Sequence, residues 1–202
     1  MVKKIYSLAL IMPREYFKIA HRDIFHYLLP NSRALISKRL IVHGKKPVCS
    51  QKSFFTGAGK IELGNGCIFG FISGGFYRGG CIEFQARSVD AIISIGNLVK
   101  TNNNIFICSV NFISVGDNTL IGQYVTIIDH DGHALDPSKR NELGEFGKVM
   151  IGKNVWIGNN VTILKNTEIG DNTVIATGAV VSGNFPANVI IGGVPAKIIR
   201  SL

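Results

Sequence analysis

The sequence predicts a mainly β fold, a parallel β-solenoid preceded by a short helical N-terminal segment. From residue 151 the chain divides into units of six, IGKNVW, IGNNVT, ILKNTE, IGDNTV and IATGAV, and each unit begins with Ile. A six-residue period fits neither an amphipathic helix nor a simple alternating strand. The composition, 46% hydrophobic and only 17% charged with 23 Gly, excludes a disordered chain.

Each unit predicts a short strand followed by a corner, because one aliphatic, one turn-forming and one small residue recur in it. Three such sides make a coil of about 18 residues whose aliphatic side chains stack inside. The period extends across most of residues 57–185 and is less regular before residue 95. We therefore expect one solenoid domain over residues 51–202.

Residues 1–50 lack the six-residue period. Their apolar residues have mixed spacings of three and four, which predicts one or two short helices and then a strand near residues 39–43. This segment carries ten Lys or Arg against two acidic residues, a net charge of +8 out of +9 for the whole chain. Two interpretations stay open: a cap on the first coil, which solenoids need, and a basic amphipathic segment on an anionic membrane surface.

The regular pattern breaks once in its most regular part. Counting from Val115 in sixes, the aliphatic residue is absent at His133 and returns at Ile151. Residues 129–150 are therefore predicted to leave the wall as a polar loop, which begins DHDGHALD. Insertions in solenoids tend to map to one binding face, and histidine is the side chain suited to a general base near neutral pH. His133 and His130 are the two candidates.

The composition and motifs of the chain also limit where the protein is located and what it binds. No apolar run approaches the about 20 residues that span a bilayer, and residues 1–12 lack a small-residue cleavage site. We predict a cytoplasmic protein, with the inner face of the membrane as the location if the basic segment binds lipid. The chain shows no nucleic-acid-binding motif, and no metal is expected, because only His130 and His133 lie within the repeats. Buried thiols in a reducing compartment are predicted for Cys49, Cys67, Cys81 and Cys108.

The run IGKNVWIGNNVTILKNTEIGDNTVIATGAVVS, followed by GGVPAKIIR, resembles the hexapeptide-repeat acyltransferases, in particular the sugar O-acetyltransferase branch with the galactoside and maltose acetyltransferases. The resemblance covers about residues 57–202. It implies a left-handed parallel β-helix and a homotrimer with active sites between subunits. It also implies an acetyl-CoA-dependent transfer of acetyl to a hydroxyl of a saccharide acceptor, as in capsule or O-antigen synthesis.

The resemblance also implies roles for individual residues. Related polysaccharide acetyltransferases show Asp-x-Asp-x-His-x-Leu-Asp at the break, and residues 129–136 match with the histidine at His133. This favours His133 as the catalytic base, with His130 as the alternative and with Asp131 or Asp129 as a candidate to orient the ring.

The acetyl-CoA contacts come from the late coils in this family, and basic side chains there meet the phosphates. One departure is Gly183, where many relatives carry a basic residue. Acceptor contacts are predicted at Asn102 and Asn104, although asparagine at a corner can also serve the turn alone. A second departure is Val110, which stands where the galactoside enzymes use a carboxylate near this coil. The implied acetyl-CoA contacts are Trp156, Gly158, Asn159, Thr177, Ser182, Lys197 and Arg200.

Other functions remain open on the same fold: an N-acetyltransferase for an amino sugar, an antibiotic or serine acetyltransferase, and a non-catalytic scaffold. Enzymes that acylate sugar nucleotides often carry an added nucleotide-binding domain, and residues 1–50 lack the Gly-rich start of one. A scaffold has no need of a histidine at an extruded break. We therefore favour the saccharide O-acetyltransferase.

Overall fold

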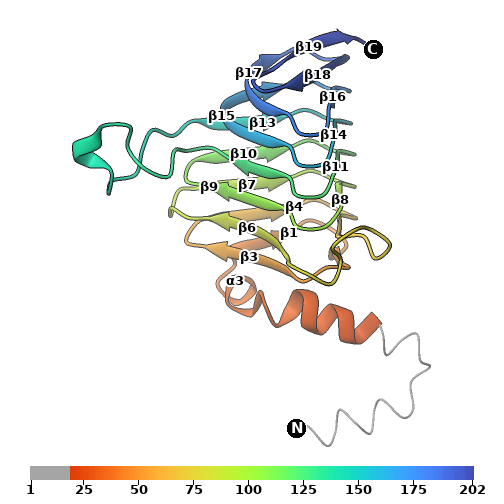
Figure 1. The fold of residues 1–202 in the computed structure, drawn as a ribbon. Coiled ribbons are helices and arrows are strands. Elements are labelled where there is room, and N and C mark those ends of the chain that lie inside the picture. Colours follow the sequence, from red (N-terminus) through yellow and green to blue (C-terminus); the bar gives the residue numbers. More distant parts are fainter. Residues whose placement is uncertain (1–18) are drawn as a thin grey trace, which may run out of the picture.

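The computed structural model describes residues 19–202 (Figure 1). Residues 19–22 are helical and continue as the π-helix η1 (Asp23–Leu28), and α3 (Ser32–Ile36) follows. The rest of the chain is a stack of short strands with these helices at one end (Figure 1). The expected mainly β fold is confirmed as parallel strands that close nearly into a β-helix. The part of the expected N-terminal helical segment that falls on residues 1–18 lies outside the described residues.

The strands form three faces, and within a face each strand pairs with the equivalent strand of the next coil. One sheet follows one face, bends through two longer strands and returns along a second face. The first face holds β1 (Leu40–Val42), β4 (Lys60–Leu63), β7 (Ile92–Ile95), β10 (Phe112–Val115) and β13 (Lys148–Ile151). The second holds β3 (Ser53–Gly57), β6 (Ile82–Ala86), β9 (Phe106–Ser109) and β12 (Thr126–Ile128), and the bent strands are β15 (Thr162–Ile169) and β17 (Val180–Phe185).

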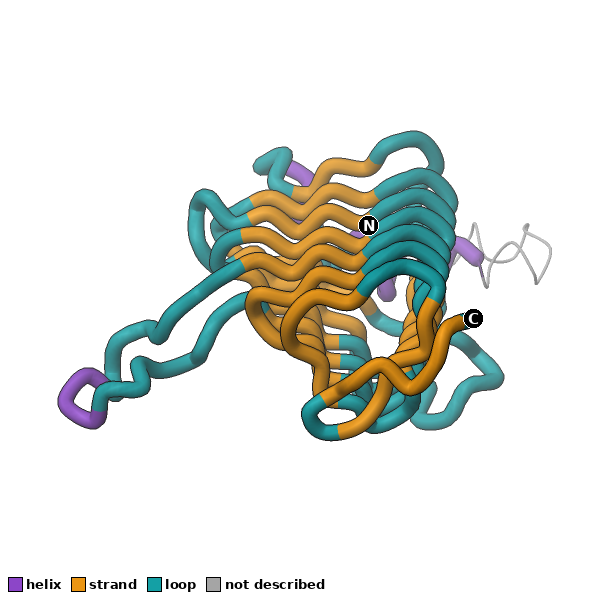
Figure 2. Tube along the Cα trace, turned by 90° about the horizontal axis from the view of Figure 1, so that it is seen from above, coloured by secondary structure: helices purple, strands orange, loops and turns teal. Residues whose placement is uncertain are grey.

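The third face is a second sheet, and it ends in an antiparallel pair that closes the C-terminal end of the stack. Viewed along the axis, the coils lie over one another in register (Figure 2). The strands of this face are β2 (Val48–Cys49), β5 (Ile68–Phe69), β8 (Lys100–Thr101), β11 (Leu120–Ile121), β14 (Trp156–Ile157), β16 (Val174–Ile175), β18 (Val189–Gly193) and β19 (Ala196–Ser201).

The strand register gives the length of each coil. Ile151 pairs with Ile169, a step of 169 − 151 = 18 residues, as the six-residue period predicts. Val115 pairs with Ile151, a step of 36, so one coil carries 18 extra residues. Ile61 pairs with Ile93, a step of 32. The extra residues leave the wall as two loops, residues 129–147 and residues 70–81. The sequence pattern predicted only the first, and it placed the end of that loop at residue 150, three residues too late, because β13 begins at Lys148.

The first coil begins at Leu40, in the strand expected near residues 39–43 and before the expected domain boundary at residue 50. Its open end is covered by η1, whose Tyr27 is 4% exposed and packs edge-on against Phe55 at 6.2 Å between ring centroids. Phe55, Phe69 and Phe84 fill the core of the first coils, and Ile and Val fill the later ones. The early coils also differ in length, with steps of 61 − 40 = 21 and 93 − 61 = 32 residues, so the period is weaker before residue 95.

The corners of the coils use the left-handed backbone conformation, which asparagine tolerates better than most side chains. Backbone hydrogen bonds link these corner residues from one coil to the next. One corner stacks Leu98, Asn118, Asn154, Asn172 and Asn188, and another stacks Asn104, Tyr124, Asn160 and Gly178, all at positive φ.

Within residues 19–202 there is no helix of the length and apolar character that crossing a membrane requires.

Candidate active site

Residues 129–147 form an ordered hairpin that projects from the corner between β12 and β13 (Figures 1 and 2). Its arms are joined by backbone hydrogen bonds, from Asp131 N to Glu145 O at 2.8 Å and from Gly147 N to Asp129 O at 2.7 Å. A short 3₁₀ turn, η2 (Pro137–Lys139), forms the tip, where the Asp136 carboxylate accepts from Ser138 N. The polar break in the repeat is therefore an ordered hairpin, and backbone hydrogen bonds join its two arms where it leaves the wall.

The base of the hairpin is organised by Asp129, a fully buried carboxylate. Its Oδ2 accepts from Ser109 Oγ at 2.6 Å and from Asn111 N at 2.9 Å. Its Oδ1 accepts from Val110 N at 2.9 Å and from His130 Nδ1 at 3.0 Å. A buried charge needs such partners, and these four hydrogen bonds stabilise the corner.

The two histidines have different surroundings. His130 is 5% exposed, and its Nδ1 donates to Asp129. His133 is exposed, and its Nδ1 donates to the carbonyl oxygen of Arg140 at 2.6 Å, while Arg140 Nη1 donates to Ala134 O. In each neutral ring the proton is assigned to Nδ1, because its partner is an acceptor, and Nε2 keeps its lone pair. Either ring can therefore act as a base through Nε2.

Asp131, expected to orient a histidine ring, pairs with Lys165 of β15. Lys165 Nζ lies 2.5 Å from Asp131 Oδ2 and 3.2 Å from Glu145 Oε2, so it links both arms of the hairpin to the wall. The hydrogen bond to Asp131 raises the pKa of Lys165 above its ordinary value. The carboxylate that contacts an imidazole is Asp129, on His130.

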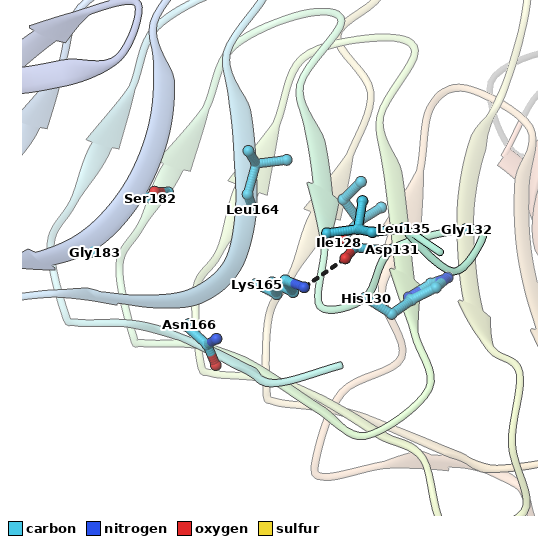
Figure 3. Close-up of a pocket in the computed structure, with 10 residues that line it drawn as sticks. All are labelled: Ile128, His130, Asp131, Gly132, Leu135, Leu164, Lys165, Asn166, Ser182 and Gly183. Carbon is cyan, nitrogen blue, oxygen red and sulfur yellow. Dashed lines mark hydrogen bonds and ion pairs between the residues drawn. The ribbon is translucent and has the colours of Figure 1, made fainter. Parts of the chain in front are cut away.

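A groove of about 590 Å³ lies between the root of the hairpin and the last coils (Figure 3). Ile128, Leu135 and Leu164 supply apolar side chains to it. Figure 3 shows Lys165 directed at Asp131, with Ser182 on the neighbouring strand β17. His130 and Ser182 therefore face one groove, whereas His133 lies farther out on the hairpin and does not line it.

Most residues predicted to bind acetyl-CoA lie at another corner, between the third and second faces. Trp156 in β14 is 58% exposed. Asn159 accepts a hydrogen bond from Gln123 N, and a Cβ at Gly158 would come within 2.7 Å of Thr177 N. Lys197 and Arg200 are exposed on β19. Within one chain, the hairpin histidines and this corner are separate.

Asn102 and Asn104 lie at that same corner, lower in the stack. The Asn102 side chain accepts from Asn103 N at 2.8 Å. Asn104 N donates to Gln51 Oε1 at 2.7 Å, and Asn104 Oδ1 accepts from Gln51 Nε2 at 3.0 Å. Part of the asparagine run therefore serves to hold the corner and the loop beside it.

Three features of this region were not predicted from the sequence: the loop at residues 70–81, the four-bonded Asp129 and the link through Lys165. A longer spacing between Leu63 and Ile95 together with a Gly-rich stretch signals the loop. Nothing in the sequence signals that Lys165 meets Asp131, because the two are 34 residues apart.

Among residues 19–202, no group of three or more His, Cys, Asp or Glu side chains is arranged to hold a metal ion.

Residues 148–183 match the family model described as bacterial transferase hexapeptide (six repeats). The chain is 36% identical over 118 residues to a putative lipopolysaccharide biosynthesis O-acetyl transferase, WbbJ, of Escherichia coli (strain K12), covering 54% of this chain and 60% of the relative. It is 38% identical over 112 residues to the galactoside O-acetyltransferase of the same organism, covering 54% of each chain. The predicted resemblance to hexapeptide-repeat acyltransferases is confirmed.

The matches cover only part of each protein, and the chain spans between half and two thirds of the length of these curated relatives. Among solved structures, a hexapeptide-repeat-containing acetyltransferase of Vibrio cholerae O1 biovar eltor, complexed with acetyl coenzyme A, matches with a TM-score of 0.53 at 24% identity. That match covers 89% of this chain and 81% of that one. At this identity the likeness shows the fold.

Proposed function

We propose that the protein is an acetyl-CoA-dependent O-acetyltransferase that acetylates a hydroxyl of a saccharide, in the synthesis of a surface polysaccharide such as capsule or O-antigen. The observation that carries the proposal is the ordered hairpin at the break of the solenoid, with an exposed His133 whose Nδ1 is held by Arg140 O. The curated relatives named O-acetyltransferases support the reaction class.

His133 is the proposed general base. Its Nε2 takes the proton of the acceptor hydroxyl, and that oxygen attacks the thioester carbonyl carbon of acetyl-CoA. The carbon–sulfur bond breaks, and the imidazolium returns its proton to the departing thiolate, so the products are an acetyl ester and CoA. The Arg140 carbonyl keeps the ring in the required tautomer and stabilises the imidazolium as it forms. His130 is the alternative base, and its burial with Asp129 favours a structural role at the root of the hairpin.

The donor site is proposed along the late coils. The groove by Leu164 and Ser182 offers an apolar wall and a hydroxyl, which suit the mixed character of a pantetheine arm. The exposed cations Lys197 and Arg200 suit the phosphates of CoA. Asn159 and Thr177 lie on the corner where the family resemblance implies the remaining contacts, with Trp156 exposed beside them.

A left-handed β-helix assembled as a homotrimer is part of the proposal. Within one chain the His133 hairpin and the corner of Asn102, Asn159 and Thr177 are separate, so a single subunit does not join base, donor and acceptor. The hairpin of one subunit, reaching the corner of its neighbour, would complete the site. The projection of the hairpin away from its own wall supports this arrangement (Figure 1).

The basic N-terminal segment is proposed to contact the inner face of an anionic membrane, where lipid-linked saccharides are acetylated. Its helices pack Tyr27 and Asn31 inward and leave large apolar side chains outward. The same segment carries exposed basic residues, which suits an anionic surface. The exposed apolar residues are Ile24, Phe25, Leu28, Leu29 and Ile36, and the exposed basic residues are Arg33, Lys38, Lys45 and Lys46.

The test is release of free thiol from acetyl-CoA with a panel of sugars, sugar nucleotides and lipid-linked oligosaccharides. Amino sugars in the panel distinguish O- from N-acetylation, which is the alternative reaction on this fold. His133→Ala should lower turnover by about 10²–10⁴-fold, the usual contribution of a general base. The matched control is His43→Ala, an exposed histidine in the first coil, which should leave turnover unchanged.

Two results would contradict the assignment. Full activity in His133→Ala, with activity lost in a folded His130→Ala protein, would move the base to His130. Failure of the wild-type protein to bind acetyl-CoA and to release thiol with every acceptor would instead indicate a non-catalytic solenoid.

A further inference from the structure

The loop at residues 70–81 is held against the corner of the solenoid by hydrogen bonds. Asn103, which is fully buried, donates from Nδ2 to Phe71 O and Gly75 O, both at 3.0 Å, and its Oδ1 accepts from Phe71 N at 3.0 Å. Gln51 Nε2 lies 3.3 Å from Tyr77 O. The loop is therefore a second built insertion, and the hairpin site does not use it.

The loop brings Phe76 against Tyr124, with ring centroids 5.1 Å apart and an interplanar angle of 67°. Both residues are exposed, Phe76 to 61% and Tyr124 to 40%. Both also have the left-handed backbone conformation, at φ 58° and φ 55°. That conformation is unfavourable for an aromatic residue, and such outliers concentrate at functional sites.

Tyr124 occupies a corner position at which the neighbouring coils have asparagine. The corner residue one coil below is Asn104 and the corner residue one coil above is Asn160, and asparagine adopts this conformation more readily. An aromatic ring at this position has no role in closing the coil. Its edge-on contact with a ring from an inserted loop points to a surface made for a ligand.

A hollow of about 310 Å³ lies on the Tyr124 side of this pair, lined by Tyr124, Asn104, Glu83, Gly79 and Gly80, and Phe76 borders it through its contact with Tyr124. The Nδ2 atom of Asn104 is buried and has no hydrogen-bond partner among the described residues 19–202. Buried donors without a partner are rare, and each one calls for an explanation such as a bound group. Glu83 Oε1 accepts from Gln85 Nε2, and its second carboxylate oxygen remains available as an acceptor.

We propose that Phe76, Tyr124, Asn104 and Glu83 form a saccharide subsite, the aromatic subsite, that docks the acceptor. Sugar rings present C–H faces, which pack on aromatic faces, and hydroxyls, which pair with amides and carboxylates. The subsite lies at the corner that also holds Asn102, Asn159 and Thr177. Its role as an acceptor site rests on the proposed function, whereas its binding of a saccharide does not.

The test compares Tyr124→Asn with the matched control Leu98→Asn. Leu98 is likewise a non-asparagine corner residue at φ 58°, 47% exposed, but at the other corner stack. Both variants install asparagine, the residue that the coil above uses at the same corner, Asn160 above Tyr124 and Asn118 above Leu98, so both should fold. Tyr124→Asn should raise the KM for the saccharide acceptor at least about 10-fold, with kcat and the KM for acetyl-CoA within about 2-fold of wild type. Leu98→Asn should change none of these constants.

Saccharide binding is measured separately by saturation-transfer NMR, using neutral and acidic mono- to tetrasaccharides without acetyl-CoA. Tyr124→Asn should abolish transfer to the bound sugar, and Leu98→Asn should retain it. Binding that persists in a protein lacking transferase activity would support the subsite and refute the proposed function. An unchanged KM and unchanged sugar binding in Tyr124→Asn would overturn the subsite, and so would dissociation of the oligomer, because the pair would then be a subunit contact.

Discussion

Replacing Asp129 by Asn tests whether the hairpin depends on the buried carboxylate at its root. The carboxylate accepts four hydrogen bonds, from Ser109 Oγ, Val110 N, Asn111 N and His130 Nδ1, and none of its surface is exposed. An amide keeps one oxygen acceptor but turns an NH₂ group toward two of these donors. Two of the four hydrogen bonds are therefore lost and two donors are left unpaired.

The expected loss of folding stability is about 3 kcal/mol, because hydrogen bonds to a charged group contribute about 1.5–3 kcal/mol each and some relaxation is expected. For a chain of this length that corresponds to a melting temperature lower by roughly 6–12 °C. The assay is thermal unfolding followed by circular dichroism. Hydrogen exchange at Asp131 N and Gly147 N, the amides that join the arms, provides the second readout.

The matched control is Asp90→Asn, which neutralises an exposed carboxylate on the same solenoid. It should stay within about 0.5 kcal/mol of wild type. A melting temperature for Asp129→Asn less than about 2 °C below wild type, with unchanged exchange in the hairpin, would refute the reasoning. The hairpin would then be held by its own backbone pairs and by Lys165.

Four further outcomes are expected. Lys165→Met should speed hydrogen exchange in the hairpin. Because the Lys165 pKa is raised in the folded protein, the contribution of its ion pairs should be complete below the ordinary lysine pKa of about 10.4 and be lost as the pH rises through the raised value. In a thiol titration at pH 8, half-buried Cys81 should react first. Burial raises the pKa of Cys49 to about 12 and of Cys108 to about 11, so these thiols should react only after denaturation. Leu98→Asn should stabilise the fold by about 1 kcal/mol, since it removes a left-handed leucine, as denaturant unfolding would measure. Phe25→Glu should weaken co-sedimentation with vesicles of anionic lipid without changing the melting temperature, because Phe25 is 49% exposed. Equal sedimentation of wild type and variant would argue that this face only caps the solenoid.

The sequence by itself determined the solenoid, the 18-residue coil and the place of the break. These are local and repeated properties, since every coil needs an inward aliphatic residue and a residue that tolerates the corner. The same period located residues 129–150 as an insertion and drew attention to His130 and His133. The left-handed twist, the trimer and the choice of His133 came from the resemblance and stay predictions.

Only the tertiary structure decided which side chains meet across coils. Asp131 and Lys165 are 34 residues apart and touch because the first residues of the 18-residue insertion lie beside β15, before the hairpin leaves the wall. Phe76 meets Tyr124 because the loop at residues 70–81 lies along the corner, which the longer spacing between Leu63 and Ile95 does not by itself show. The six-residue period of the sequence predicts how the coils stack. The contacts that the inserted loops make depend instead on the direction in which each loop leaves the wall. That orientation is set by buried polar side chains such as Asp129 and Asn103, whose partners the sequence pattern does not name.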